Sequence, residues 1–65
     1  MTEEQKKTET VAIMLNSLNE DNRSICLQSG MDPEEVERNI EQSQASLGFM
    51  LSNMYDKMME ANLIA

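Results

Sequence analysis

The fold of this chain is decided by the stretch Met31-Asp32-Pro33-Glu34-Glu35-Val36, which combines several local signals of a helix start. Asp32 suits the N-cap position, and Pro33 suits the first helical position because its missing N–H needs no partner there. Glu35 stands three residues after the cap, as in a capping box, and the apolar ends of the stretch are spaced as a hydrophobic staple. We therefore predict that a helix begins at residue 33.

Downstream of this start, nothing interrupts the helix until about residue 62, which makes it on the order of 45 Å long. Its apolar residues form one stripe with the alternating steps of four and three residues that define a heptad seam. We expect self-association through the C-terminal part of this stripe, which contains Leu47, Met50, Leu51, Met54 and Met58. A second apolar face carries Phe49, Met59 and Leu63, which favours an intermolecular, buried position for this half of the helix.

The segment before residue 31 predicts two shorter helices. Apolar residues from Val11 to Leu18 are spaced as one helical face, and Thr2 with Gln5 has the form of a capping box. A helix is therefore expected over about residues 3–18. The polar residues 19–22 include good N-cap types and are expected to break the chain. A short helix over about residues 22–28 then ends at Gly30, which suits the left-handed position after a helix.

These elements predict an all-α fold of two short helices plus one long amphipathic C-terminal helix, within a single small domain that spans residues 1–65. The two short helices are expected to cover only the N-terminal half of the long one. Residues 47–63 then project and pair with a second copy of the chain.

The size of the chain also favours a helical homodimer. A domain of 65 residues buries only about 60% of the surface that its unfolded chain exposes. Small domains are usually stabilised further by disulfides, a metal or a partner chain. Cys26 is the only cysteine and there is no histidine, so an internal disulfide and the usual zinc sites are excluded. Idealised helix packing or oligomerisation remains, and the size of the chain favours self-association or binding to an obligate partner.

Compartment and chemistry follow from the same composition. The charged N-terminus lacks the apolar stretch of a signal peptide, and the lone Cys26 fits a reducing setting, so we expect a soluble cytoplasmic protein. The commonest general base is absent, and Cys26, flanked by apolar residues, has no histidine to activate it. We expect no enzymatic activity, no metal and no cofactor. The seven methionines fit either core filling or an adaptable binding surface.

Twelve acidic residues stand against five basic ones, which gives a net charge of −7. Because nucleic-acid affinity depends on Lys and Arg, nucleic acid is an unfavourable partner, as is an anionic membrane. Residues 25–40 nevertheless resemble a helix-turn-helix, with a small residue at Cys26 and a turn glycine at Gly30. That resemblance implies a second helix whose first turns enter the major groove. Here those positions are mostly acidic, and Arg38 is their only cation.

The function that we expect is a small, acidic, non-enzymatic protein-interaction module. It is expected to act as an adaptor or inhibitor that docks on a larger protein with a basic surface, through an acidic face of Glu34, Glu37 and Glu41. Such composition is common among phage and mobile-element accessory proteins. Two alternatives stay open: a helix-turn-helix-like transcriptional regulator or DNA mimic, and a structural assembly or scaffold component.

Overall fold

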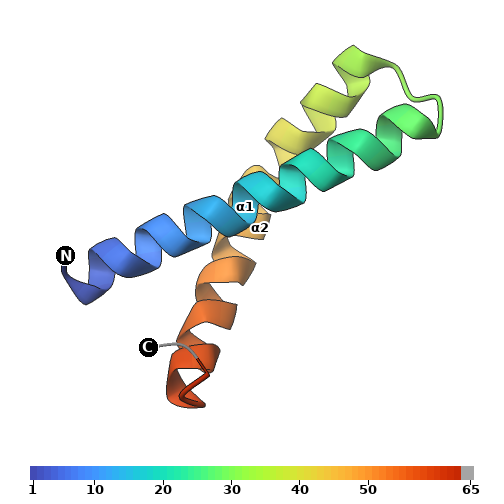
Figure 1. Ribbon diagram of the computed structural model, residues 1–65. Helices are drawn as coiled ribbons and strands as arrows, with labels where there is room; N and C mark the ends of the chain where they lie inside the picture. The colour runs from blue at the N-terminus through green and yellow to red at the C-terminus, as the bar shows by residue number, and fades with distance from the viewer. Residues whose placement is uncertain (64–65) are drawn as a thin grey trace.

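Two long helices make up the computed structural model, which describes residues 1–63. Helix α1 spans Glu3–Gln28, helix α2 spans Pro33–Glu60, and residues 29–32 connect them. The chain folds back on itself at this connection, so the two helices form an antiparallel hairpin (Figure 1). The prediction of an all-α fold is confirmed. The prediction of two short helices plus one long helix is wrong, because one continuous helix replaces the two short ones.

The predicted break at residues 19–22 lies inside α1. Asn and Asp favour N-caps, but inside a helix they cost only a few tenths of a kcal/mol, up to about 0.7 kcal/mol, relative to alanine. Packing of one helical face outweighs such propensities. Asn19 lies on that packed face and is only 8% exposed, so the helix continues through it to Gln28.

The C-terminal half of α2 does not project. Because α1 has 26 residues, it is long enough to cover α2 well beyond the N-terminal half. Leu51 and Tyr55 are buried, at 6% and 3% exposure. Lys7 Nζ lies 3.0 Å from Asp56 Oδ1 and ties the far end of the hairpin together. The predicted projection of residues 47–63 is therefore wrong, and α2 ends at Glu60, earlier than predicted.

The connection between the helices has the local geometry that its sequence predicts. Gly30 adopts a φ of +90°, its N–H donates to the Leu27 carbonyl and the next N–H donates to the Cys26 carbonyl, which together form a Schellman motif. Asp32 caps α2, but its carboxylate accepts from the N–H of Glu34, at 2.9 Å, rather than from that of Glu35. The predicted helix start at Pro33 is confirmed.

The start of α1 also follows its prediction. Gln5 N–H donates to Thr2 Oγ1 at 3.1 Å, and Thr2 N–H donates back to Gln5 Oε1 at 2.8 Å, which is a complete capping box. Two of the backbone N–H groups that a helix N-terminus leaves unpaired are thereby satisfied.

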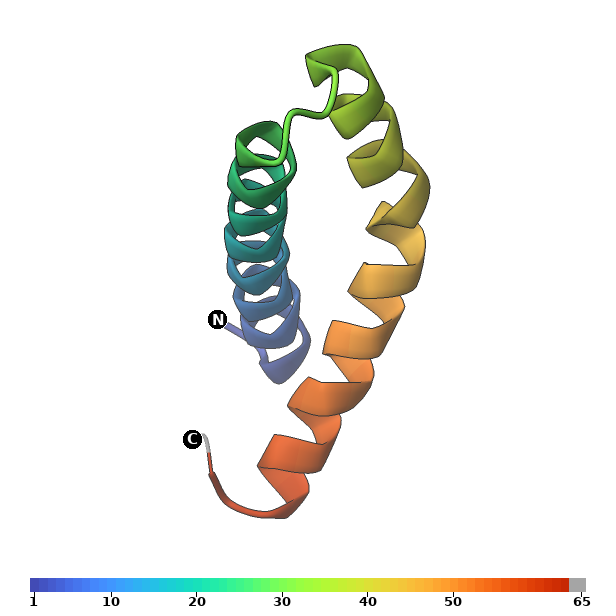
Figure 2. The ribbon, with the colours of Figure 1, turned by 90° about the vertical axis from the view of Figure 1, so that its right-hand side faces the viewer.

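Contacts between the helices follow steps of four residues. In α2 the packed positions run Leu47, Leu51 and Tyr55, and in α1 they run through Val11, Leu15 and Asn19. When such rows interlock, two helices cross at about 50° in magnitude, a wider angle than in a coiled coil. Figure 1 shows the two helices crossing near their middles, with their open ends apart, and Figure 2 shows α1 along one side of α2. The predicted heptad seam leaves this row after Leu47.

The packed rows divide the hairpin into two flanks. A residue directly before or after a packed position is rotated from it by about 100° in opposite directions. Because the two helices are antiparallel, the residues that directly follow a packed position in α1 lie on the same flank as the residues that directly follow a packed position in α2. Residues that follow the rows make a polar face, which contains Asn16, Glu20, Glu37 and Glu41. Residues that precede them make an apolar face, which contains Met14, Leu18, Met50 and Met54.

Candidate partner-binding site

The charged residues of the chain gather at the two ends of the hairpin. The end next to the connection, here called the turn end, carries seven acidic and two basic residues, for a net charge of −5. Its acidic residues are Glu20, Asp21, Asp32, Glu34, Glu35, Glu37 and Glu41. The opposite, open end carries five acidic and three basic residues, for a net charge of −2. The negative potential of the molecule is therefore concentrated at the turn end.

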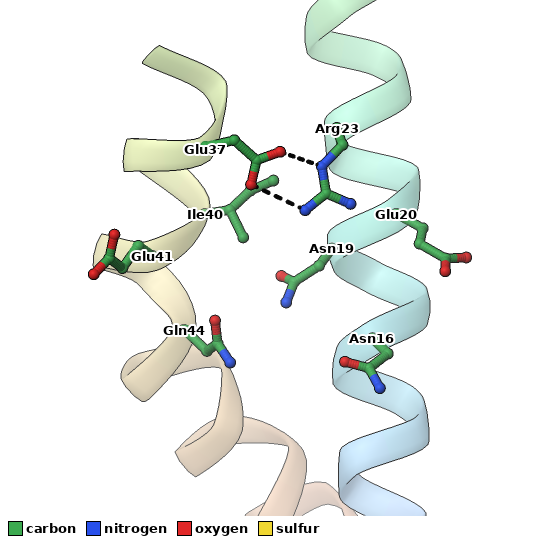
Figure 3. A pocket seen from close by; sticks show the side chains of 8 residues that line it. All are labelled: Asn16, Asn19, Glu20, Arg23, Glu37, Ile40, Glu41 and Gln44. Carbon is green, nitrogen blue, oxygen red and sulfur yellow. Dashed lines mark hydrogen bonds and ion pairs between the residues drawn. The ribbon is translucent and has the colours of Figure 1, made fainter. Parts of the chain in front are cut away.

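A polar cleft lies between the helices on the polar face near the turn end. Four residues of α1 and four of α2 line it, namely Asn16, Asn19, Glu20, Arg23, Glu37, Ile40, Glu41 and Gln44. Figure 3 shows Asn19 directed from α1 towards α2, with the carboxylates of Glu20 and Glu41 directed outward on either side. The cleft thus combines a buried amide with acidic groups at its rim.

Arg23 and Glu37 join the two helices across this cleft. The guanidinium donates to both carboxylate oxygens, with Nη2 at 3.1 Å from Oε2 (Figure 3). The hydrogen bond from Arg23 lowers the pKa of Glu37, and the same bond raises the pKa of Arg23. Because both side chains are solvent-accessible, this pair contributes little to the stability of the hairpin.

Asn19 is an unusual residue for the centre of a helix contact. Its side chain is buried, and its Oδ1 accepts no hydrogen bond. A buried acceptor without a donor costs about 1–3 kcal/mol. The hydroxyl of Tyr55, in the other half of the hairpin, is likewise buried without a partner. Of the two groups, only Asn19 lines the polar cleft.

The structure brings together the three glutamates of the predicted acidic face. Glu34, Glu37 and Glu41 line one shallow hollow with Pro33 and Arg38. Of these three glutamates, Glu37 is paired with Arg23, whereas Glu34 and Glu41 form no ion pair with the described residues. The contribution of α1 was not predicted, because Asn19 and Glu20 were expected in a break between two short helices. A helix continued through residue 23 places them opposite α2.

The residues predicted to mediate self-association are divided by the structure. Leu51 lies in the core of the hairpin, Leu47 and Met58 are half-buried, and Met50 and Met54 are 51% and 52% exposed. The predicted second apolar face is divided as well: its members Phe49 and Leu63 are exposed and its member Met59 is half-buried. The five predicted positions therefore do not form one surface.

The described residues offer little for metal or thiol chemistry. Within residues 1–63, no three His, Cys, Asp or Glu side chains are placed to hold a metal ion together. Cys26 is half-buried, and its Sγ donates to Asn22 Oδ1 at 3.4 Å. In the same range no helix combines the length and apolar character needed to cross a membrane. What the site offers to a partner is hydrogen-bond acceptors and negative charge.

Comparison with protein-family models, with curated proteins and with solved structures finds no match to this chain.

Proposed function

We propose that this protein is a non-enzymatic interaction module that docks through its turn end onto a basic surface of a larger protein in the cytoplasm. The observation that carries the proposal is the polar cleft, where a buried amide acceptor without a donor lies between outward-facing carboxylates. A lysine or arginine side chain of a partner supplies positive charge and hydrogen-bond donors to the exposed carboxylates at the rim of this cleft.

The distribution of charge supports a protein partner over a nucleic acid. A net charge of −5 at the turn end repels phosphates, and Arg23 is already occupied by Glu37. Mimicry of DNA favours negative charge along the length of the molecule, whereas residues 10–19 and 42–55 contain none. The charge is therefore suited to a local basic patch.

The proposal predicts that binding depends on carboxylates of the turn end and not on charge in general. Neutralising Glu34 and Glu41 together, by Glu34→Gln and Glu41→Gln, is expected to weaken partner binding at least about tenfold, or about 1.4 kcal/mol. The measurement is capture of partners from host lysate by the immobilised protein, followed by affinity determination with the purified partner at two salt concentrations.

The matched control neutralises two carboxylates at the open end, by Glu3→Gln and Glu60→Gln, and so changes the net charge equally. This control is expected to bind like the wild type. Equal loss of binding in both double variants, or binding unchanged by salt, would contradict a docking site at the turn end.

A further inference from the structure

The middle of the hairpin is a band without any charged residue. Residues 10–19 of α1 and residues 42–55 of α2 contain no Asp, Glu, Lys or Arg, and antiparallel pairing places these two segments opposite each other. The band nevertheless exposes large apolar side chains, namely Ile13, Leu18, Phe49, Met50 and Met54. The chain has 17 charged residues, and none of them lies in this band. Exposing the apolar side chains of the band to water is unfavourable in free energy.

The hairpin also exposes more surface than a folded monomer of its mass is expected to expose. The hairpin exposes 4934 Å². A folded monomer of 7.4 kDa is expected to expose about 4,200 Å², so the excess is about 700 Å². A standard protein–protein interface buries about 800 Å² on each partner. The excess therefore matches one side of one interface.

We infer that the apolar face of Met14, Leu18, Met50 and Met54 packs against the same face of a second copy, in an antiparallel dimer of hairpins. The four side chains belong to both helices and lie on one flank of the band, so a single contact can bury them together. Methionine and leucine side chains fill irregular gaps well, which suits a contact between identical surfaces. Because the band contains no charged residue, a contact between two such bands desolvates no charged side chain within them.

The orientation of the second copy follows from the charges at the ends. In a parallel dimer, two turn ends of net charge −5 lie side by side. In an antiparallel dimer, each turn end lies beside an open end, which carries three of the five basic residues, Lys6, Lys7 and Lys57. The two turn ends then stand at opposite ends of a molecule whose hairpins are 41 Å long, well beyond the screening length of about 8 Å in physiological salt.

This inference is independent of the proposed function, and its test is the mass of the protein in solution. Sedimentation equilibrium over a wide concentration range is expected to show a dimer. Met50→Glu and Met54→Glu are each expected to raise the dimer dissociation constant at least about a hundredfold, because a carboxylate is then buried in the contact. A monomer at every concentration would overturn the inference.

The matched control is Phe49→Glu, which places the same charge on the neighbouring residue of α2. Phe49 is 70% exposed and lies on the outer surface of the helix, away from the apolar face, so this variant is expected to dimerise like the wild type. Circular dichroism establishes that each variant is helical. A dimer that Phe49→Glu dissociates and Met50→Glu does not would place the contact elsewhere and overturn the inference.

The single cysteine allows a second test on the wild-type side chains of the contact. With Met14 near the two-fold axis, Cys26 lies 12 residues along α1, so spin labels on the two copies are expected roughly 36 Å apart along the dimer. A parallel dimer brings the two labels close together. A short distance in a pulsed electron–electron double resonance measurement would therefore overturn the antiparallel arrangement, even where the glutamate variants fail to fold.

Discussion

Asn19 occupies a position in α1 where an apolar side chain would pack well. It lies in the row that contacts α2, it is buried, and its Oδ1 accepts no hydrogen bond. Polar residues in helix contacts are sometimes retained because they specify register or binding at a cost in stability. The unsatisfied Oδ1 of Asn19 lowers the stability of the hairpin, but the same amide lines the polar cleft. A role in docking would account for a residue that is unfavourable for folding.

Asn19→Leu is expected to raise the free energy of unfolding by about 1–3 kcal/mol, because it removes an unsatisfied buried acceptor and adds apolar burial. Urea denaturation at fixed protein concentration measures the change, and partner capture by the same variant measures the cost to docking. A lower stability would show that the amide contributes a favourable contact and would remove the reason for assigning it to the site.

At the scale of the helix, the sequence predicted what is determined locally. The start of α2 at Asp32 and Pro33, the capping box at Thr2 and the left-handed Gly30 each depend on a few neighbouring residues, and all three are present. The continuity of α1 could not be predicted in this way. Residues 19–22 resemble a cap by composition, and the packing of α1 as a whole against α2 keeps them helical.

The row of α2 that packs against α1 also could not be predicted from the sequence. Its apolar residues occur in adjacent pairs, such as Met50 with Leu51 and Met54 with Tyr55, so steps of three and steps of four fit the sequence equally well. The crossing of the helices decides between them, since a wide crossing follows rows of four. Leu51 and Tyr55 are buried as a result, and both methionines are left on the apolar face.

Alanine substitution of the two glycines is expected to change the free energy of unfolding in opposite directions. Gly30→Ala is expected to destabilise the protein by about 1–2 kcal/mol, because a φ of +90° is unfavourable for a side chain, although nothing lies within 4 Å of an added Cβ. Gly48→Ala also meets nothing within 4 Å, but it lies inside a helix, so a gain of about 0.5–1 kcal/mol is expected.

Urea denaturation of both alanine variants, at equal protein concentration, checks this pair. Gly48 follows the packed residue Leu47 and so lies on the polar face, away from the proposed contact between copies. Changes of the same sign in the two variants would contradict the assigned backbone conformations.

At the scale of the whole molecule, charge and apolar surface are separated along one axis. The turn end is acidic, the central band is uncharged, and the open end is nearly balanced. In the proposed antiparallel dimer, the two acidic turn ends face in opposite directions, because each lies at the far end of its own hairpin. A dimer of this form presents two docking sites to two partner molecules, which is the geometry of an adaptor.

The most direct test of docking at the turn end is to locate where a basic ligand binds. Titration of the isotope-labelled protein with a short peptide of lysine and arginine, followed by amide chemical shifts, is expected to perturb residues 20–23 and 32–41. The central band and the open end are expected to remain unchanged. Perturbations spread equally over the acidic residues of the open end, such as Glu3, Glu9 and Glu60, would contradict docking at the turn end, because attraction would then follow net charge alone.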